Sequence, residues 1–271
     1  MEVIVAPYAG FCSGVKRAIK LTEDALKKGK QVYTLGPIIH NPAVVKNLEK
    51  KGIRILRQYK KGEDAIVVIR SHGLEPAVLE EIKSYGYEIV DATCPYVRRA
   101  QNYVENLKRE GYFIVIIGEA RHPEVKGLLG FAGEAGMVYE PEKPLPSRRI
   151  GIVEQTTIDI ASLRAALGDL VSRIDEIKVF NTICAETKLR INSALDLCQR
   201  VDLVIVVGGK NSANTTNLAN LCGKIKKTYH IERAGEIKRQ WLKGVKKIGV
   251  AAGTSTPQWV IDEVVKRLKR Y

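Results

Sequence analysis

The chain lacks the features that mark membrane proteins, secreted proteins and single-strand nucleic-acid binders. Its longest apolar runs, YFIVIIG and VDLVIVVGG, are far shorter than the roughly 20 residues that span a bilayer. The opening stretch MEVIVAPYAG has no basic region before a long apolar one, so we expect no secretory signal and a cytoplasmic protein. Aromatic residues are only 6% and are not interleaved with basic ones, which argues against stacking on bases.

The chain also lacks a long basic arm, although its formal net charge is +14. Lysine and arginine are scattered as doublets, and solvated helix faces explain most of them. Two functional interpretations remain: a basic face for an acidic protein or a nucleic acid, or a site for a polyanionic small molecule. We expect neither a membrane nor a nucleic acid as partner.

No C-x-x-C pair occurs, which excludes zinc ribbons and ferredoxin-type cysteine runs as local motifs. The cysteine count is five, and an odd number in a long cytoplasmic chain does not suggest a disulfide framework. Any metal site must therefore use distant parts of the chain. Cys198 and Cys222 continue apolar helical faces, and we expect both to be buried core thiols.

The other three cysteines share one setting. Cys12, Cys94 and Cys184 each follow a β-branched run, begin a stretch with helical spacing and match C-x-x-[VT]-[KR]. The first two are 82 residues apart and the last two 90 residues apart, which indicates three copies of one strand–turn–Cys–helix unit. A thiol at a helix N-terminus faces the positive end of the helix dipole, which favours the thiolate that binds metals.

Three such thiolates that converged would make a three-cysteine site. This donor set suits an iron–sulfur cube with one open iron, and a catalytic zinc with one open position is the alternative. Three unrelated turn cysteines would be the simplest explanation of all, but the repeat argues against it.

Elsewhere, strand-like runs such as AIVVIR, YFIVIIG and DLVIVVGG alternate with helical stretches, which predicts an α/β protein with parallel sheets. In such sheets ligands gather at the carboxyl ends of the strands. Imidazoles, hydroxyls and amides at those ends suit an anion. The chain has neither a P-loop nor G-x-G-x-x-G, so the ligand is not held by a standard nucleotide motif. The residues at these ends are His40, His72, His122, Glu124, Gln155, Thr156, Thr157, Ser212, Asn214, Thr254 and Ser255.

Nine motifs in order resemble the 4-hydroxy-3-methylbut-2-enyl diphosphate reductase family (IspH/LytB). They are GFCSGVKRAI, IIHNPAVV, RSHG, DATCPYV, RHPEVKG, EQTT, NTIC, GGKNSANT and AGTSTP, and they extend over nearly the whole chain. The resemblance implies three α/β lobes in a pseudo-threefold arrangement around a central 4Fe–4S cluster. We expect these lobes at residues 1–94, 95–181 and 182–271, the last with a C-terminal helix.

The resemblance also implies roles for individual residues. Cys12, Cys94 and Cys184 would be the three cluster ligands, with the open iron taking the substrate hydroxyl. Glu124 would deliver protons, and Thr156 would orient the substrate alcohol and relay a proton. The diphosphate pocket would be formed by His40, His72, His122, Ser212, Asn214 and Ser255.

The implied reaction is the reductive dehydroxylation of an allylic alcohol to isopentenyl and dimethylallyl diphosphate, the last step of the methylerythritol phosphate pathway of isoprenoid biosynthesis. Two electrons and two protons enter and water leaves. The basic surface makes reduced ferredoxin or flavodoxin a suitable electron donor. Three positions depart from the family pattern: Glu186 replaces a small residue, Ile191 a glutamine and Ala213 a serine.

Two other classes of function remain open. A hydro-lyase acting on a hydroxy acid through an open cluster would need arginines aimed at carboxylates, whereas these strand ends carry His, Ser, Thr and Asn. A non-enzymatic module that binds anions or RNA would be colourless, and its binding would survive Cys→Ser changes.

Overall fold

The chain is an α/β protein, as its alternating pattern predicts. We describe it from a computed structural model that covers residues 1–39 and 41–271. Within that part of the chain, the strands form three parallel sheets of four strands each. No helix among these residues is long and apolar enough to cross a membrane.

The chain divides into two compact units. The first consists of Met1–Lys16, Ile39–Lys50 and Ala185–Tyr271, and the second of Arg17–Ile38 and Lys51–Cys184. We describe each unit by itself.

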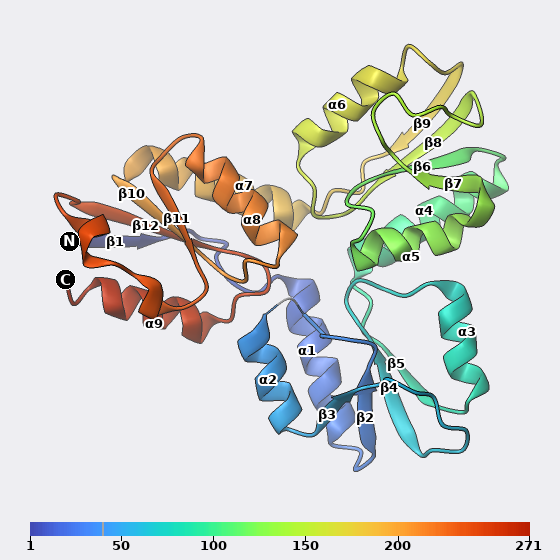
Figure 1. Cartoon of the computed structure of the whole chain (residues 1–271), viewed down its shortest axis with the longest axis horizontal. Coiled ribbons are helices and arrows are strands. Elements are labelled where there is room, and N and C mark those ends of the chain that lie inside the picture. Colours follow the sequence, from blue (N-terminus) through green and yellow to red (C-terminus); the bar gives the residue numbers. More distant parts are fainter. Residues whose placement is uncertain (40) are drawn as a thin grey trace. The chain divides into compact units, whose positions relative to one another are not determined.

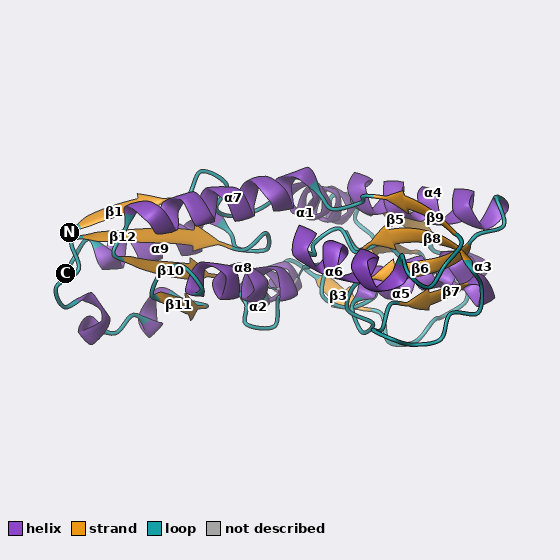
Figure 2. Cartoon of the chain, turned by 90° about the horizontal axis from the view of Figure 1, so that it is seen from above, coloured by secondary structure: helices purple, strands orange, loops and turns teal. Residues whose placement is uncertain are grey.

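The first unit is built on a sheet with the strand order β1-β12-β10-β11 (Figure 2). Its strands are β1 (Glu2–Val5), β10 (Leu203–Val207), β11 (Thr228–Ile231) and β12 (Lys247–Ala252). Its helices are α2 (Pro42–Lys50), α7 (Ala185–Arg200), α8 (Ala213–Gly223) and α9 (Gln258–Leu268), with short 3-10 turns at Ala234–Glu236 and Arg239–Leu242. Both ends of the chain lie near the amino ends of these strands (Figure 1).

Helices cover both faces of this sheet because its strands are apolar on both sides. On β10, Ile205 packs with α9 on one face, while Val204 packs with α7 and α8 on the other. Cys198 and Cys222 belong to the second of these cores and are fully buried, which confirms that they are core thiols. Burial raises the pKa of the Cys222 thiol to about 12.

The second unit contains the other two sheets, ordered β3-β2-β4-β5 and β7-β6-β8-β9. The first of these comprises β2 (Gln31–Thr34), β3 (Ile53–Ile55), β4 (Ala65–Ile69) and β5 (Glu88–Asp91), with α3 (Pro76–Ser84) packed on it.

The other sheet of the second unit comprises β6 (Phe113–Ile117), β7 (Gly136–Val138), β8 (Arg149–Glu154) and β9 (Glu176–Phe180). Helices α4 (Pro95–Arg109) and α5 (Pro123–Ala132) cover one face of this sheet and α6 (Ile160–Leu170) the other; a 3-10 turn follows α5 at Gly133–Ala135. Helix α1 (Ser13–Leu26) begins in the first unit and continues in the second.

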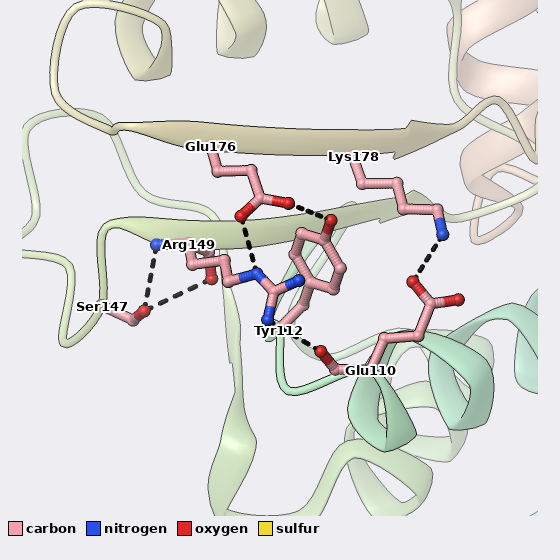
Figure 3. Close-up of polar contacts among 6 residues, drawn as sticks. All are labelled: Glu110, Tyr112, Ser147, Arg149, Glu176 and Lys178. Carbon is pink, nitrogen blue, oxygen red and sulfur yellow. Dashed lines mark hydrogen bonds and ion pairs between the residues drawn. The ribbon is translucent and has the colours of Figure 1, made fainter.

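Polar side chains tie together the amino ends of strands β8 and β9 (Figure 3). The hydroxyl of Tyr112 donates to Glu176, whose second carboxylate oxygen accepts from Arg149 Nε at 2.7 Å. The Arg149 guanidinium lies 4.3 Å from the centre of the Tyr112 ring and donates to the Glu110 carbonyl at 2.9 Å. These contacts connect the strands at their amino ends, which is the end of the sheet opposite the carboxyl ends.

The three sheets repeat one strand order. Counted from one edge, the orders are β1-β12-β10-β11, β5-β4-β2-β3 and β9-β8-β6-β7. In each, the edge strand β1, β5 or β9 is the one whose following turn carries Cys12, Cys94 or Cys184. The repeat expected from the cysteine spacing is therefore present in the topology. The lobe boundaries 1–94, 95–181 and 182–271 stay a prediction; strand β1 pairs with β12.

Candidate functional site

Each of the three cysteines stands between a strand and the first turn of a helix. Cys94 is the N-cap of α4, with φ −60° and ψ 136°, and Pro95 fills the first helical position, where a missing N–H costs nothing. Cys12 directly precedes α1 and Cys184 directly precedes α7. All three side chains are partly buried.

A hydrogen bond recurs at the three cysteines. The backbone N–H of each donates to a carbonyl just beyond the neighbouring strand of its own sheet. Cys12 donates to Thr254 at 3.3 Å, Cys94 to Ser71 at 2.9 Å and Cys184 to Thr156 at 2.9 Å. Each acceptor is next to or among the residues predicted to bind or to act on the ligand. The fold thus attaches every cysteine turn to a loop of predicted site residues.

In the first unit, Thr254 joins two parts of the predicted site. Its carbonyl accepts from Cys12, and its N–H donates to Oδ1 of Asn214 at 3.3 Å. Ser212 is the N-cap of α8, and its hydroxyl accepts from the N–H of Thr215. Ser255 is 4% exposed and follows Thr254 directly. The hydroxyl, amide and helix N-terminus predicted to bind an anion therefore do lie at neighbouring loops.

Two glycines in these loops leave no space for a side chain. A Cβ on Gly253 would lie 1.9 Å from the Thr215 hydroxyl oxygen, and one on Gly208 would lie 2.6 Å from that of Thr256. The loops after β10 and β12 are therefore packed directly on each other, and their spacing depends on both glycines.

In the second unit, Glu124 is almost wholly buried, with 1% of its surface exposed. Its Oε1 accepts from the N–H of Thr156 at 2.6 Å, and its Oε2 accepts from the Thr156 hydroxyl at 3.0 Å. Burial raises the pKa of this carboxyl to about 7, although both Thr156 bonds favour the charged form and oppose the rise. Glu124 is thus a group that can both hold and release a proton near neutral pH.

The two described histidines of the predicted pocket lie side by side in this unit. The ring centres of His72 and His122 are 5.3 Å apart, and the rings meet edge to face at 83°. His122 is the N-cap of α5, and its Nδ1 accepts from the N–H of Glu124 at 3.2 Å. This contact places the proton of a neutral His122 ring on Nε2. His40, the third predicted histidine, lies outside the described residues.

The geometry joins most of the predicted site residues within each unit. Cys12, Ser212, Asn214 and Ser255 belong to the first unit; Cys94, Cys184, His72, His122, Glu124 and Thr156 belong to the second. Among the described residues, no three His, Cys, Asp or Glu side chains are placed as a metal-binding group.

Sequence patterns missed several contacts beside these residues. Glu186 accepts from both the N–H of Ser13, at 3.0 Å, and its hydroxyl, so it caps the first turn of α1 directly after Cys12. Arg190 is 4% exposed and donates to the carbonyls of Tyr8 and Ala252. Ile191 packs on the apolar core beneath α7, and Ala213 is the first residue of α8. A charge in a helical stretch does not reveal its partner far along the chain, so only the structure could identify these contacts.

The fold and site define an α/β protein with three equivalent parallel sheets, each presenting a thiol at a helix N-terminus. A family model described as LytB protein matches residues 3–269. The chain belongs to this family, as the nine motifs indicated.

Relatives of the chain carry one activity in their names. A protein from Geotalea uraniireducens named 4-hydroxy-3-methylbut-2-enyl diphosphate reductase is 45% identical, over 100% of this chain and 98% of its own length. One of the same name from Geobacter sulfurreducens is 44% identical, over 100% and 98%.

Two solved structures are similar throughout. The structure of (E)-4-hydroxy-3-methyl-but-2-enyl diphosphate reductase, described as the terminal enzyme of the non-mevalonate pathway, is 43% identical, covers 100% of both chains and has a TM-score of 0.77. That of E-1-hydroxy-2-methyl-but-2-enyl-4-diphosphate reductase from Plasmodium falciparum is 28% identical, covers 99% of this chain and 88% of that one, and has a TM-score of 0.91.

Proposed function

We propose that the chain is an oxidoreductase that reductively dehydroxylates 4-hydroxy-3-methylbut-2-enyl diphosphate. Two electrons and two protons are consumed, the C–O bond of the allylic alcohol breaks, and water leaves as isopentenyl or dimethylallyl diphosphate forms. Relatives that share about 45% identity over the whole length bear this activity in their names. The observation that carries the proposal is a series of two hydrogen bonds. The first joins the buried acid Glu124 to Thr156, and the second joins Thr156 to the turn of Cys184.

The residues present fit a 4Fe–4S cluster held by Cys12, Cys94 and Cys184. Sulfur donors select such clusters, and all three thiols occupy the same strand–turn–helix position. At Cys12 the backbone also supports the sulfur, which accepts from the N–H of Val15 at 3.4 Å. When bound, the cluster would supply electrons one at a time and a Lewis-acidic iron for the substrate hydroxyl.

The protein's own part is to hold the diphosphate and to move a proton. His72 and His122 offer imidazole donors, and His40 would offer a third. Ser212, Asn214 and Ser255 offer hydroxyl and amide donors. Fixing the diphosphate orients the attached alkenyl chain, so that binding energy is used for positioning.

Departure of the hydroxyl requires a proton, and the raised pKa of Glu124, about 7, keeps a large fraction of this carboxyl protonated at neutral pH. The Thr156 hydroxyl, 3.0 Å from Glu124 Oε2, can orient the alcohol and pass this proton on.

The electron donor belongs to the proposal as well. A net charge of +14 favours an acidic redox protein, and reduced ferredoxin or flavodoxin fits that description. Because its relatives are reductases, we retain neither the hydro-lyase nor the non-enzymatic binding module.

The test is made on protein purified without oxygen. We expect a brown protein with close to four irons and four sulfides per chain, whose visible spectrum changes when the diphosphate substrate is added. With a chemical one-electron reductant it should release both isopentenyl and dimethylallyl diphosphate. A colourless protein that takes up no iron and sulfide on reconstitution, or a brown one that leaves the substrate unchanged, would contradict the proposal.

A further inference from the structure

Gln101 is a buried polar residue in the middle of α4. Only 1% of its surface is exposed, and its neighbours on the same helix face, Ala100 and Val104, are apolar and fully buried. An amide in such a place is costly unless its polar atoms are used. Neither the cysteine motif nor the predicted site includes it.

A hydrogen bond from Arg98 fixes the orientation of the Gln101 amide. Its Oε1 accepts from Arg98 Nη1 at 2.8 Å, and since a guanidinium can only donate, the oxygen must face Arg98. Arg98 is itself held by an ion pair with Asp91, whose Oδ1 accepts from the N–H of Thr93 at 2.9 Å. The amide nitrogen Nε2 therefore points away, and it is a buried donor without an acceptor among the described residues.

That nitrogen lies against the turn that carries His72 and against the helix that His122 caps. A Cβ on Gly73, the residue after His72, would lie only 2.4 Å from Nε2. A Cβ on Gly127, one turn into the helix that His122 caps, would lie 3.8 Å from it and 3.9 Å from the carbonyl oxygen of His72. Gly73 has a φ of +77°, so the turn that carries His72 depends on this glycine as well as on the contact.

Gln101 is thus packed between the backbone next to His72 and the helix headed by His122 and Glu124. A change in the length or tilt of this side chain would change the spacing of the two loops, and with it the edge-to-face contact of the two imidazoles at 5.3 Å. Interiors are close-packed, so such a shift is transmitted and not absorbed.

We propose that Gln101 is a positioning residue for His72 and His122: its amide, oriented by Arg98, sets the separation of the two histidine loops and so their affinity for an anion. This inference rests on the proposed function for the nature of the anion, a diphosphate. It adds a link from the Cys94 turn, through Asp91 and Arg98, to the anion pocket.

The test uses Gln101→Met in the full chain and measures the binding of inorganic pyrophosphate by calorimetry. Methionine has nearly the same length and no hydrogen-bond donor. Folding should be preserved, because the lost amide nitrogen has no acceptor in the described part of the chain and because Arg98, which loses its acceptor, is partly exposed and can bond to water instead. We expect the dissociation constant for pyrophosphate to rise about tenfold, since misplacement by a fraction of an ångström is costly at a preorganised site. The melting temperature should change little.

Val104→Ala is the matched control. It removes fully buried methyl groups from the apolar core of the same helix and no polar group, so it should lower the melting temperature and leave pyrophosphate affinity unchanged. Gln101→Glu, which keeps an acceptor for Arg98 and loses the donor, should weaken pyrophosphate binding at least as much as Gln101→Met. In turnover, KM for the substrate should rise more than kcat falls.

The outcomes separate the two proposals. Unchanged pyrophosphate affinity in Gln101→Met, or an equal loss in Val104→Ala, would overturn the role of Gln101 and leave the proposed function standing. Failure of the unsubstituted chain to bind pyrophosphate would instead count against the anion pocket itself, and the role of Gln101 would be rejected with it.

Discussion

Thr156 is hydrogen-bonded on both sides: its N–H and hydroxyl donate to the Glu124 carboxylate, and its carbonyl accepts from the N–H of Cys184 at 2.9 Å. One residue therefore connects the buried acid to the third cysteine turn. This arrangement makes the chemistry of the site testable by changes that leave the fold intact.

Replacing Glu124 by glutamine should remove the proton donor and keep its shape. The amide oxygen can still accept from the N–H of Thr156, so the loop should hold its place. We expect kcat to fall by roughly 10² to 10⁴, with little change in KM and in iron content. Glu119→Gln, at an exposed position in the loop before α5, is the control and should have nearly normal kcat. A Glu124→Gln enzyme as fast as this control would reject the role of Glu124.

The raised pKa of Glu124 also predicts how stability depends on pH. Between the ordinary value of 4.5 and about 7, the folded protein keeps a proton that the unfolded chain has released. Its contribution to stability is therefore complete below pH 4.5 and is lost as the pH rises through 7. Relative to Glu124→Gln, the unfolding free energy should decrease by about 3 kcal/mol over this window. Denaturant titrations of both proteins from pH 4 to 9 measure the difference; a constant difference would show that the carboxyl is not protonated at neutral pH.

Thr156→Val should shift the alkaline limb of the pH profile, where kcat falls with rising pH, to higher pH. The hydroxyl of Thr156 favours the charged form of Glu124, so its removal should raise the pKa of that carboxyl further. We expect kcat to be lower but to persist to higher pH than in the unsubstituted enzyme. Thr157→Val, which removes a hydroxyl that accepts from Gln155, should leave the limb where it is. A limb shifted to lower pH in Thr156→Val would contradict the assignment.

Cys94→Ser and Cys198→Ser separate ligand thiols from core thiols. Cys94 is partly buried at the N-terminus of α4, whereas Cys198 is fully buried among apolar side chains. The first change should abolish the visible absorption and the bound iron and sulfide of protein purified without oxygen. The second should leave both unchanged. Equal iron content in the two variants would exclude Cys94 as a ligand.

Tyr112→Phe should act on stability alone. The hydroxyl that it removes donates to Glu176 in the polar group at the amino ends of β8 and β9 (Figure 3), away from the site. We expect a lower melting temperature with normal kcat and KM. Tyr8→Phe, at a side chain that is 44% exposed, should change neither. Loss of activity in Tyr112→Phe at a temperature where it is folded would contradict this separation.

The sequence was sufficient to predict the α/β class and the repeat because both depend on local patterns. Runs such as those around Val67 and Ile116 are apolar at every position, which is typical of strands covered on both faces. The cysteine turns were recognisable because a β-branched run, a cysteine and a helical stretch are adjacent in the chain.

Other parts of the site depend on which distant segments meet, and spacing in a sequence does not contain that information. The bonds of Glu186 to Ser13 and of Arg190 to Tyr8 join residues more than 170 positions apart. Gln101 looks like any polar residue of an amphipathic helix until its burial and its contact with Gly73 are known. The family resemblance could indicate the reacting residues but not these supports, because motifs mark the residues and not their neighbours.

The pairing of β1 with β12 has a consequence for how the protein is made. Val5 lies opposite Val250, and the turn after β1 receives its backbone partner from Thr254. A ribosome produces β1 and Cys12 before the strands β2 to β11, but their partners in β12 and in the turn after it emerge only after all of these. The sheets of β2–β5 and β6–β9 use only strands that are contiguous in the chain, so each can form during synthesis. The turn of Cys12 is therefore translated before both of these sheets but reaches its native hydrogen bonds after them.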